Sequence, residues 1–269
     1  MSWAAHDLEP YSIQRHLGIR VAFIPLLIGS YSPDILTKWF VYGINVFGVG
    51  LKADQPQDFH RGWPGIGFTH SLFFGIAIAL IIYAVSHSRI WAISFMIGQW
   101  AHALTDTGDT MGTMLFFPLS LDRVSLGAWQ YAGQTGRYVD AAAYYSGLGW
   151  VWDGVWVVVA LFSWRVITRD YFYNVVAAAD GTWGWLLRRI PEEVVISLYR
   201  ASYFYGITRW VAWLIWAHVI HDYSFDLSWG GPDWVVEHMK TLNYLFGPGG
   251  CPICSAPGGG CGWASAGGG

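Results

Sequence analysis

The clearest uncharged apolar stretch of the chain runs from Gly62 to Ser88 and contains no Asp, Glu, Lys or Arg. Its centre, LFFGIAIALIIYAV at residues 72–85, lies in a run longer than the ~18 apolar residues that indicate a transmembrane helix. Only 12% of the 269 residues are charged, against roughly 25% in soluble domains. Aromatic residues make up 18% of the chain and include 18 Trp, a residue enriched at membrane–water interfaces. We therefore predict an all-α, polytopic membrane helical bundle.

Five transmembrane helices are predicted from the uncharged stretches, at residues 19–33, 68–86, 90–105, 147–164 and 208–222. Segment 39–51 is a candidate re-entrant or interfacial helix and is not counted among them. Lys and Arg collect in the cytoplasmic loops of membrane proteins, and several Arg lie between the uncharged parts of the fourth and fifth helices, namely Arg165, Arg169, Arg188, Arg189, Arg200 and Arg209. Placing that loop inside puts the N-terminus inside as well, and loops 34–67 and 106–146 outside.

The remaining composition narrows the class of protein further. A formal net charge of -3 offers no basic surplus for a nucleic-acid partner. The first ten residues lack a basic segment followed by an apolar one, so we expect insertion through internal helices. We predict one transmembrane domain over residues 1–246 and a flexible Gly/Cys-rich tail over 247–269. The cysteines Cys251, Cys254 and Cys261 all lie in that tail. The sequence does not decide whether they form a disulfide, form a labile metal clip or have no function.

Ionisable side chains near apolar segments are costly and are candidates for function. His102 and Asp106 are four residues apart, so a helix places both on one face. His70 opens the preceding apolar segment, and an antiparallel hairpin brings it beside that pair. Asp34 and His60 reach the same membrane face under the predicted topology. Imidazole and carboxylate groups are zinc ligands, although a lone interfacial His is more often only hydrogen-bonded.

At these residues the chain resembles the membrane-bound metal-dependent hydrolase family, inner-membrane proteins that include a LexA-regulated member. The resemblance covers residues 16–118 and rests on four ordered motifs: His16, the SPDI segment at 32–35, HRG at 60–62 with FTHSL at 68–72, and GQWAHALTD at 98–106. Gly112 and the segment LFFP at 115–118 follow. Leu36 stands where the family has a second Asp, and residues 63–66 are an insertion. These two departures leave the number of metal ions and the place of His60 open.

The resemblance implies a divalent metal, zinc above all, as cofactor. The ligands that it implies are His16, Asp34, His70, His102 and Asp106, with His60 as a second choice. A bound Zn²⁺ lowers the pKa of water from about 16 toward ~7 and polarises an ester. The planar cation of Arg61 suits a phosphate or carboxylate substrate, with a lipid-headgroup anchor as the alternative. Asp109 is a candidate general base or orienting partner, with a capping role as the alternative.

The predicted function is a metal-dependent hydrolase of the bacterial inner membrane, acting on a phosphoester or other ester of a lipid or envelope substrate. The competing prediction is a non-catalytic membrane subunit that keeps the family scaffold and docks other membrane proteins, which Leu36 and the unmatched residues 119–269 favour. Three polar residues of the fifth predicted helix, His218, His221 and Asp222, are expected to anchor the interface rather than to extend the site. Asp153 is left open as a bundle contact or a site neighbour.

Overall fold

The structure is a computed structural model that describes residues 4–51, 60–61, 66–131, 137–228 and 233–236. Helices dominate it, as predicted. The α-helices are α1 (Ala5–His16), α2 (Phe23–Tyr42), α4 (Leu72–Ser86), α5 (Arg89–Thr105), α6 (Arg137–Ser146), α7 (Gly149–Phe162), α8 (Arg169–Tyr171), α9 (Gly181–Leu187) and α10 (Glu192–Leu214). Shorter 3-10 or π segments are η1 (Ile66–His70), η2 (Asp106–Gly108), η3 (Trp164–Ile167), η4 (Phe172–Ala177) and η5 (Ile215–Ile220). Two small antiparallel sheets pair β1 (Ile44–Val46) with β2 (Val49–Leu51) and β3 (Arg123–Ser125) with β4 (Asp233–Val236).

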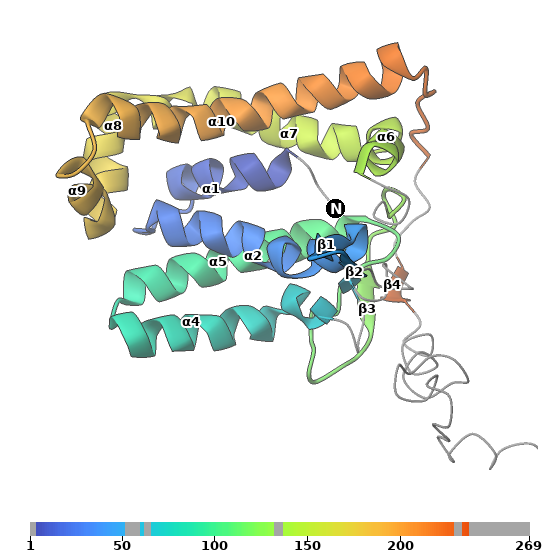
Figure 1. Ribbon diagram of the computed structural model, residues 1–269, viewed down its shortest axis with the longest axis horizontal. Helices are drawn as coiled ribbons and strands as arrows, with labels where there is room; N and C mark the ends of the chain where they lie inside the picture. Colours follow the sequence, from blue (N-terminus) through green and yellow to red (C-terminus); the bar gives the residue numbers. More distant parts are fainter. Residues whose placement is uncertain (1–3, 52–59, 62–65, 132–136, 229–232, 237–269) are drawn as a thin grey trace, which may run out of the picture.

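The helices form layers with α1 in the middle (Figure 1). Helices α7 and α10 cover one side of α1, and α2 covers the other. Helix α5 packs against α2 and carries α4 on its outer side. An aromatic core around Tyr11, Phe172 and Tyr199 joins α1 to the helices of the C-terminal half. The central layer therefore contacts both halves of the molecule.

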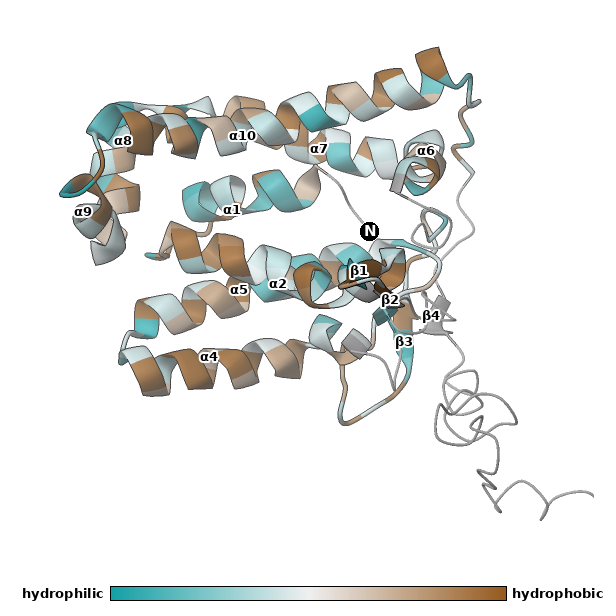
Figure 2. Cartoon of the chain, in the orientation of Figure 1, coloured by the Kyte–Doolittle hydropathy of each residue, from teal (hydrophilic) through white to brown (hydrophobic). Residues whose placement is uncertain are grey.

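Helix α1 is largely hydrophilic, as its teal and pale colours show (Figure 2), and yet most of its residues are buried. The carboxylate of Asp153, inside α7, accepts hydrogen bonds from the backbone N–H groups of Ala4 and Ala5 at 2.8 and 3.1 Å. It also accepts the hydroxyls of Tyr144 and Tyr145. The first N–H groups of a helix have no partner within it, so Asp153 anchors the start of α1. Of the two roles left open for Asp153, a bundle contact and a site neighbour, the structure shows the contact inside the bundle.

Helices α2 and α5 approach closely at two glycines. A Cβ atom added to Gly29 would lie 2.1 Å from the carbonyl oxygen of Phe95, and one added to Gly98 would lie 2.1 Å from that of Leu26. Small residues allow such backbone contact between helices. The contact holds the polar residues further along both helices at short range.

The predicted hairpin of apolar helices is present as α4 and α5. The Ser71 hydroxyl caps α4 by accepting a hydrogen bond from the Phe74 N–H, and Ser88 caps α5 in the same way through Trp91. His87 takes a left-handed conformation (φ 52°) and ends α4. The candidate re-entrant or interfacial helix at 39–51 is helical only up to Tyr42, where α2 ends, because β1 and β2 follow with positive φ at Phe47 and Gly48.

The predicted transmembrane helices at 19–33, 68–86, 90–105, 147–164 and 208–222 fall on α2, α4, α5, α7 and the end of α10 with η5. Among the described residues, no single helix has both the length and the apolar composition needed to cross a membrane. Residues 138–146 of α6 and helix α7 meet these requirements only together, as a pair bent by 83°. The five-span topology and its orientation remain predictions. The tail at 247–269 and its cysteines lie outside the described residues.

Candidate metal centre

Four of the predicted ligands come together at one end of α5: Asp34, His70, His102 and Asp106. One nitrogen or oxygen atom from each lies within 4.8 Å of the others, and all four residues are buried. Asp34 comes from α2, His70 ends η1, His102 lies in the last turn of α5, and Asp106 follows it. The i,i+4 spacing and the hairpin bring these groups together as expected, and the set could hold a metal ion.

The ring nitrogens face the two carboxylates. Nε2 of His102 lies 3.2 Å from Oδ2 of Asp106 and 3.8 Å from Oδ1 of Asp34. Nε2 of His70 lies 3.4 Å and 4.0 Å from the same two oxygens. Both Nε2 atoms are buried and have no hydrogen-bond partner among the described residues. Two imidazole nitrogens and two carboxylates around one point are a donor set that zinc and similar divalent ions prefer.

The other ring nitrogen of each histidine is held from outside. Nδ1 of His102 donates to the carbonyl oxygen of Ser30 at 2.6 Å, which leaves the Nε2 lone pair of the neutral ring facing the carboxylates. Nδ1 of His70 contacts the hydroxyl of Thr69 at 3.3 Å. Metal-binding histidines usually donate their second N–H to such an outer partner, which fixes the ring and its tautomer. The rings are therefore oriented as metal ligands are.

His6 is a site residue that the sequence prediction missed. Its ring stacks on that of His102 with centroids 3.8 Å apart, and its Nε2 lies 3.5 Å from Oδ1 of Asp106. Nδ1 faces Oε2 of Glu9 at 3.3 Å, while Oε1 of Glu9 accepts the Thr105 hydroxyl. Burial lowers the pKa of His6, but the charges of Glu9 and Asp106 outweigh burial and raise it to about 9. The same negative charges attract a metal cation, which competes with a proton for Nε2.

His60 lies beside the cluster and orients Asp34. The guanidinium Nε of Arg61 donates to Nδ1 of His60 at 3.4 Å, so the neutral ring carries its proton on Nε2 and donates to Oδ1 of Asp34 at 3.0 Å. Burial, together with the charge of Arg61, lowers the pKa of His60 to about 4 against the opposing effect of Asp34. His60 thus lies outside the group of four and contacts it through Asp34, and its role as a second-choice ligand stays a prediction.

Arg61 and Asp109 form a buried ion pair next to Asp106. Nη2 of Arg61 lies 2.7 Å from Oδ2 of Asp106 and 3.0 Å from Oδ2 of Asp109. The other carboxylate oxygen of Asp109 accepts the backbone N–H groups of Met111 and Gly112, which is the capping role named as its alternative. Both side chains are fully buried. Arg61 therefore neutralises and positions Asp106, and the geometry does not favour its predicted contact with substrate.

His16 is a predicted ligand that lies far from the cluster. It is exposed at the C-terminal end of α1, where its Nε2 bonds to the Ser163 hydroxyl at 2.7 Å. His6 and His16 occupy opposite ends of the same helix, and His6 is the one at the site. His218 and His221 also lie elsewhere: His218 bonds to backbone carbonyls and stacks on Phe225, and the His221 ring contacts the Trp216 ring at a tilt of 54°.

Gln99 gives a test of how the site is held. Its Nε2 donates to the carbonyl oxygens of Thr69 at 2.8 Å and Ser71 at 3.0 Å, and so ties the segment carrying His70 to α5. We expect Gln99→Leu to lower zinc affinity by about 10- to 100-fold, the usual effect of losing an outer-shell contact. Competition with a fluorescent chelator measures this affinity. Unchanged affinity in a folded variant would show that His70 needs no such tie.

The fold and the site thus define the class of this chain, a helical protein with a buried cluster of histidines and carboxylates. The sequence model of the YdjM inner membrane protein family matches residues 4–172, and the chain belongs to this family. The match starts before His6 and continues to residue 172, beyond the 16–118 of the predicted resemblance. The region unmatched by the family therefore begins at 173 rather than 119. Comparison with curated proteins and with solved structures gives no match.

Proposed function

We propose that the chain is a metal-dependent hydrolase of the inner membrane that acts on a phosphoester or other ester of a lipid or envelope substrate. The observation that carries the proposal is the convergence of the Nε2 atoms of His70 and His102 on the carboxylates of Asp34 and Asp106, with each Nδ1 held from outside. Structural zinc sites in proteins are mostly built from cysteine, whereas nitrogen and carboxylate donors are typical of hydrolytic centres.

In this proposal the ligands are Asp34, His70, His102 and Asp106, and His6 is a fifth candidate. A divalent metal held there supplies Lewis acidity and lowers the pKa of a water molecule toward ~7. The chain itself contributes orientation and charge. Arg61 stabilises the ionised form of Asp106, and Glu9 and His60 orient His6 and Asp34. The nearly complete burial of these groups strengthens their electrostatic interactions.

Among the described residues, Asp34 and Lys38 on α2 form the part of the site that reaches the surface, and we place substrate access there. The Asp34 side chain is 11% exposed and that of Lys38 is 24% exposed, whereas the side chains of His70, His102 and Asp106 are fully buried. Lys38 is ion-paired with Asp34. A negatively charged ester that approaches from this side meets the Lys38 ammonium first. Lys38 therefore takes the substrate-facing role that the sequence prediction gave to Arg61.

Replacing Lys38 tests this route. We expect Lys38→Gln to raise KM for an anionic phosphodiester several-fold at low salt, because a partly exposed cation interacts through a screened field. The KM for a neutral carboxylic ester should stay the same, and kcat should change little for both. Steady-state kinetics on the two substrates separate these effects. An equal loss on both substrates would mean that Lys38 acts only through Asp34.

The proposal as a whole is tested by metal analysis and hydrolysis with the same protein. Full-length chain purified in detergent is assayed for zinc, manganese and iron by mass spectrometry, and for hydrolysis of bis(p-nitrophenyl) phosphate, p-nitrophenyl phosphate, p-nitrophenyl acetate and phospholipid vesicles. The double variant His102→Ala/Asp106→Ala should lose metal and hydrolysis together. His16→Ala removes a histidine outside the cluster and is the matched control, which should keep both.

Two results would contradict the proposal. A wild-type chain that binds no divalent metal, alone or after zinc is added, would exclude a metal-dependent reaction. A chain that binds metal but hydrolyses none of these esters would favour the competing prediction, a membrane subunit that keeps the family's site without its reaction.

A further inference from the structure

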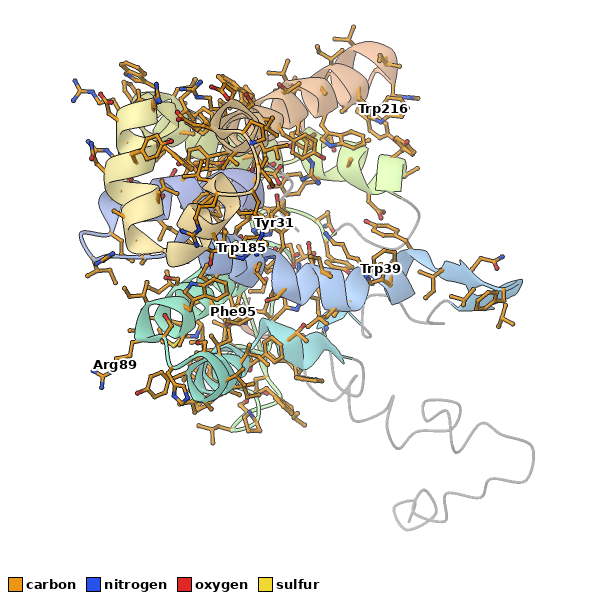
Figure 3. All side chains as sticks on the ribbon, turned by 60° about the vertical axis from the view of Figure 1, so that its left-hand side comes forward. Tyr31, Trp39, Arg89, Phe95, Trp185 and Trp216 are labelled. Atoms are coloured by element: carbon orange, nitrogen blue, oxygen red, sulfur yellow. The ribbon has the colours of Figure 1, made fainter. Side chains whose placement is uncertain are left out.

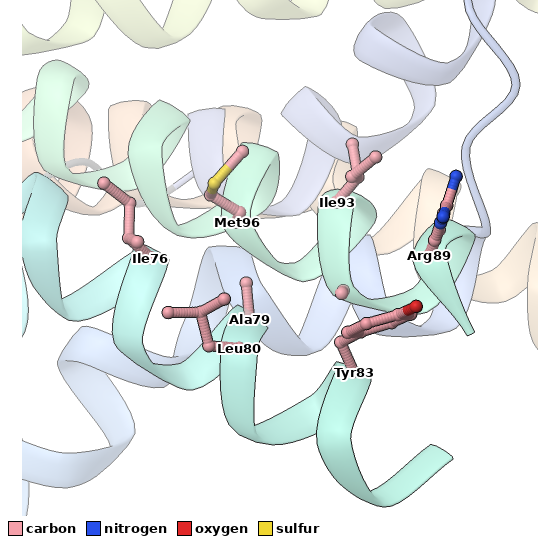
Figure 4. Close-up of a pocket in the computed structure, with 8 residues that line it drawn as sticks. Ile76, Ala79, Leu80, Tyr83, Arg89, Ile93 and Met96 are labelled. Carbon is pink, nitrogen blue, oxygen red and sulfur yellow. The ribbon is translucent and has the colours of Figure 1, made fainter. Parts of the chain in front are cut away.

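Helices α4 and α5 leave an apolar groove between them at the end away from the metal centre. Its volume is about 300 Å³, at the lower limit of small-molecule pockets. The groove is lined by two matching stripes with helical spacing, Ile76, Ala79, Leu80 and Tyr83 from α4 and Arg89, Ala92, Ile93 and Met96 from α5 (Figure 4). Ala79 and Ala92 are the buried members of these stripes, and their short side chains leave the space that larger residues would fill.

A cation stands at one end of this groove. Arg89 is the only Asp, Glu, Lys or Arg between residues 62 and 105. Its side chain is exposed and points away from the bundle (Figure 3). Within the described residues it makes no ion pair or hydrogen bond. Tyr83 lies next to it at the same end of the groove (Figure 4). The other end, at Ile76 and Met96, is apolar.

We infer that this groove binds one acyl chain of an anionic phospholipid, with the lipid phosphate at Arg89. An apolar channel with a cation at its mouth matches an amphiphile whose charge is at one end. Arg89 and Met96 are seven residues apart on α5, so the channel extends along roughly 10 Å of the helix. A free phosphate ion would use Arg89 alone and would leave the apolar stripes unexplained.

Two further observations agree with a lipid occupant. Helix α4 also exposes large apolar side chains, among them Phe73, Ile76, Leu80, Ile81 and Val85, and large exposed apolar surfaces mark interaction sites. The chain also belongs to a family of inner membrane proteins. The lipid site is separate from the metal centre, because Arg89 begins α5 and Asp106 follows its end, roughly 25 Å away along the helix.

Photo-labelling tests the inference with the full-length chain in detergent. Phosphatidylglycerol with a diazirine in one acyl chain is titrated onto the protein, and adducts are mapped by peptide mass spectrometry. We expect labelling of residues 76–96 by phosphatidylglycerol, and weaker labelling by the zwitterionic phosphatidylcholine probe. Arg89→Gln should lower the apparent affinity for phosphatidylglycerol about five-fold, as expected for one basic side chain near an anionic headgroup.

Two variants separate a specific site from general detergent-like contact. Ala79→Phe fills the floor of the groove and should remove the adducts on 76–96. Arg188→Gln removes another exposed Arg, outside the groove, and should leave the labelling as in wild type. Equal labelling by both lipids, or labelling unchanged in Arg89→Gln, would overturn the inference. Arg89 is exposed, so this variant is expected to fold even if Ala79→Phe does not.

Discussion

Asp106→Asn is expected to abolish tight metal binding and to destabilise the protein at the same time. The Asp106 carboxylate faces Nε2 of His6, His70 and His102 and pairs with Arg61 at 2.7 Å, all in a fully buried setting. An amide of the same shape keeps the packing but removes the negative charge. Loss of one partner of a buried ion pair costs about 3–5 kcal/mol, and the remaining contact of Arg61 with Asp109 reduces that cost.

The two effects are separated by measuring thermal unfolding with and without zinc. The wild-type chain should gain about 2.7 kcal/mol of stability at a zinc concentration 100 times its Kd, whereas Asp106→Asn should gain none. Asp170→Asn, at an exposed carboxylate in α8, is the matched control and should respond to zinc as wild type does. A zinc-dependent rise in Tm for Asp106→Asn equal to that of wild type would rule out Asp106 as a ligand.

The sequence predicted four members of the cluster because their positions follow from local rules. The i,i+4 spacing places His102 and Asp106 on one face, and an antiparallel hairpin needs no more than its turn to bring His70 beside them. Asp34 was placed instead by the predicted five-helix topology, and it lies inside α2 rather than after it. The inferences on His70, His102 and Asp106 hold because they depend on a helix and its nearest neighbour, and not on the arrangement of the whole bundle.

The choice between His6 and His16 could not be made in this way. Apolar runs guided the prediction, and the polar sequence of α1 does not mark it as a central helix. Its burial depends on partners distant in the sequence: Asp153 in α7 at its start, and Arg209 in α10, which pairs with Asp7 at 2.9 Å. One local signal was available, since His6 and Glu9 are three residues apart and share a helical face just as His102 and Asp106 do.

Arg61 illustrates a second limit of sequence reasoning. In the sequence, an arginine next to site residues looks the same whether its guanidinium binds an anionic substrate or a neighbouring carboxylate. Only the tertiary contacts with Asp106 and Asp109 distinguish the two, and these contacts show that the positive charge is already neutralised inside the protein. Lys38, one turn after Asp34 on α2, is the partly exposed cation at the site.

The contact between α2 and α5 leads to the second large effect, a loss of both stability and metal binding in Gly98→Ala. The new methyl group would lie 2.1 Å from the carbonyl oxygen of Leu26, a backbone atom that cannot turn aside. The helices must therefore separate by about 1 Å, since Cβ contacts under 3.0 Å essentially do not occur. One turn further along α5, the hydrogen bond from His102 to the Ser30 carbonyl spans the same interface and would be lost.

We expect Gly98→Ala to lower the free energy of unfolding by roughly 1–3 kcal/mol or more, the usual cost of overpacking, and to reduce zinc affinity by at least about 10-fold through His102. Gly181→Ala is the matched control, because, apart from its chain neighbours and the backbone of its own helix, no atom of the described residues lies within 4 Å of its added Cβ, and alanine favours a helix more than glycine does. Thermal unfolding and a zinc titration on the same samples give both quantities. If Gly98→Ala loses stability but binds zinc as wild type does, the α2–α5 distance does not control the site, and the alignment of His102 with Asp34 must come from η1 and α4 instead.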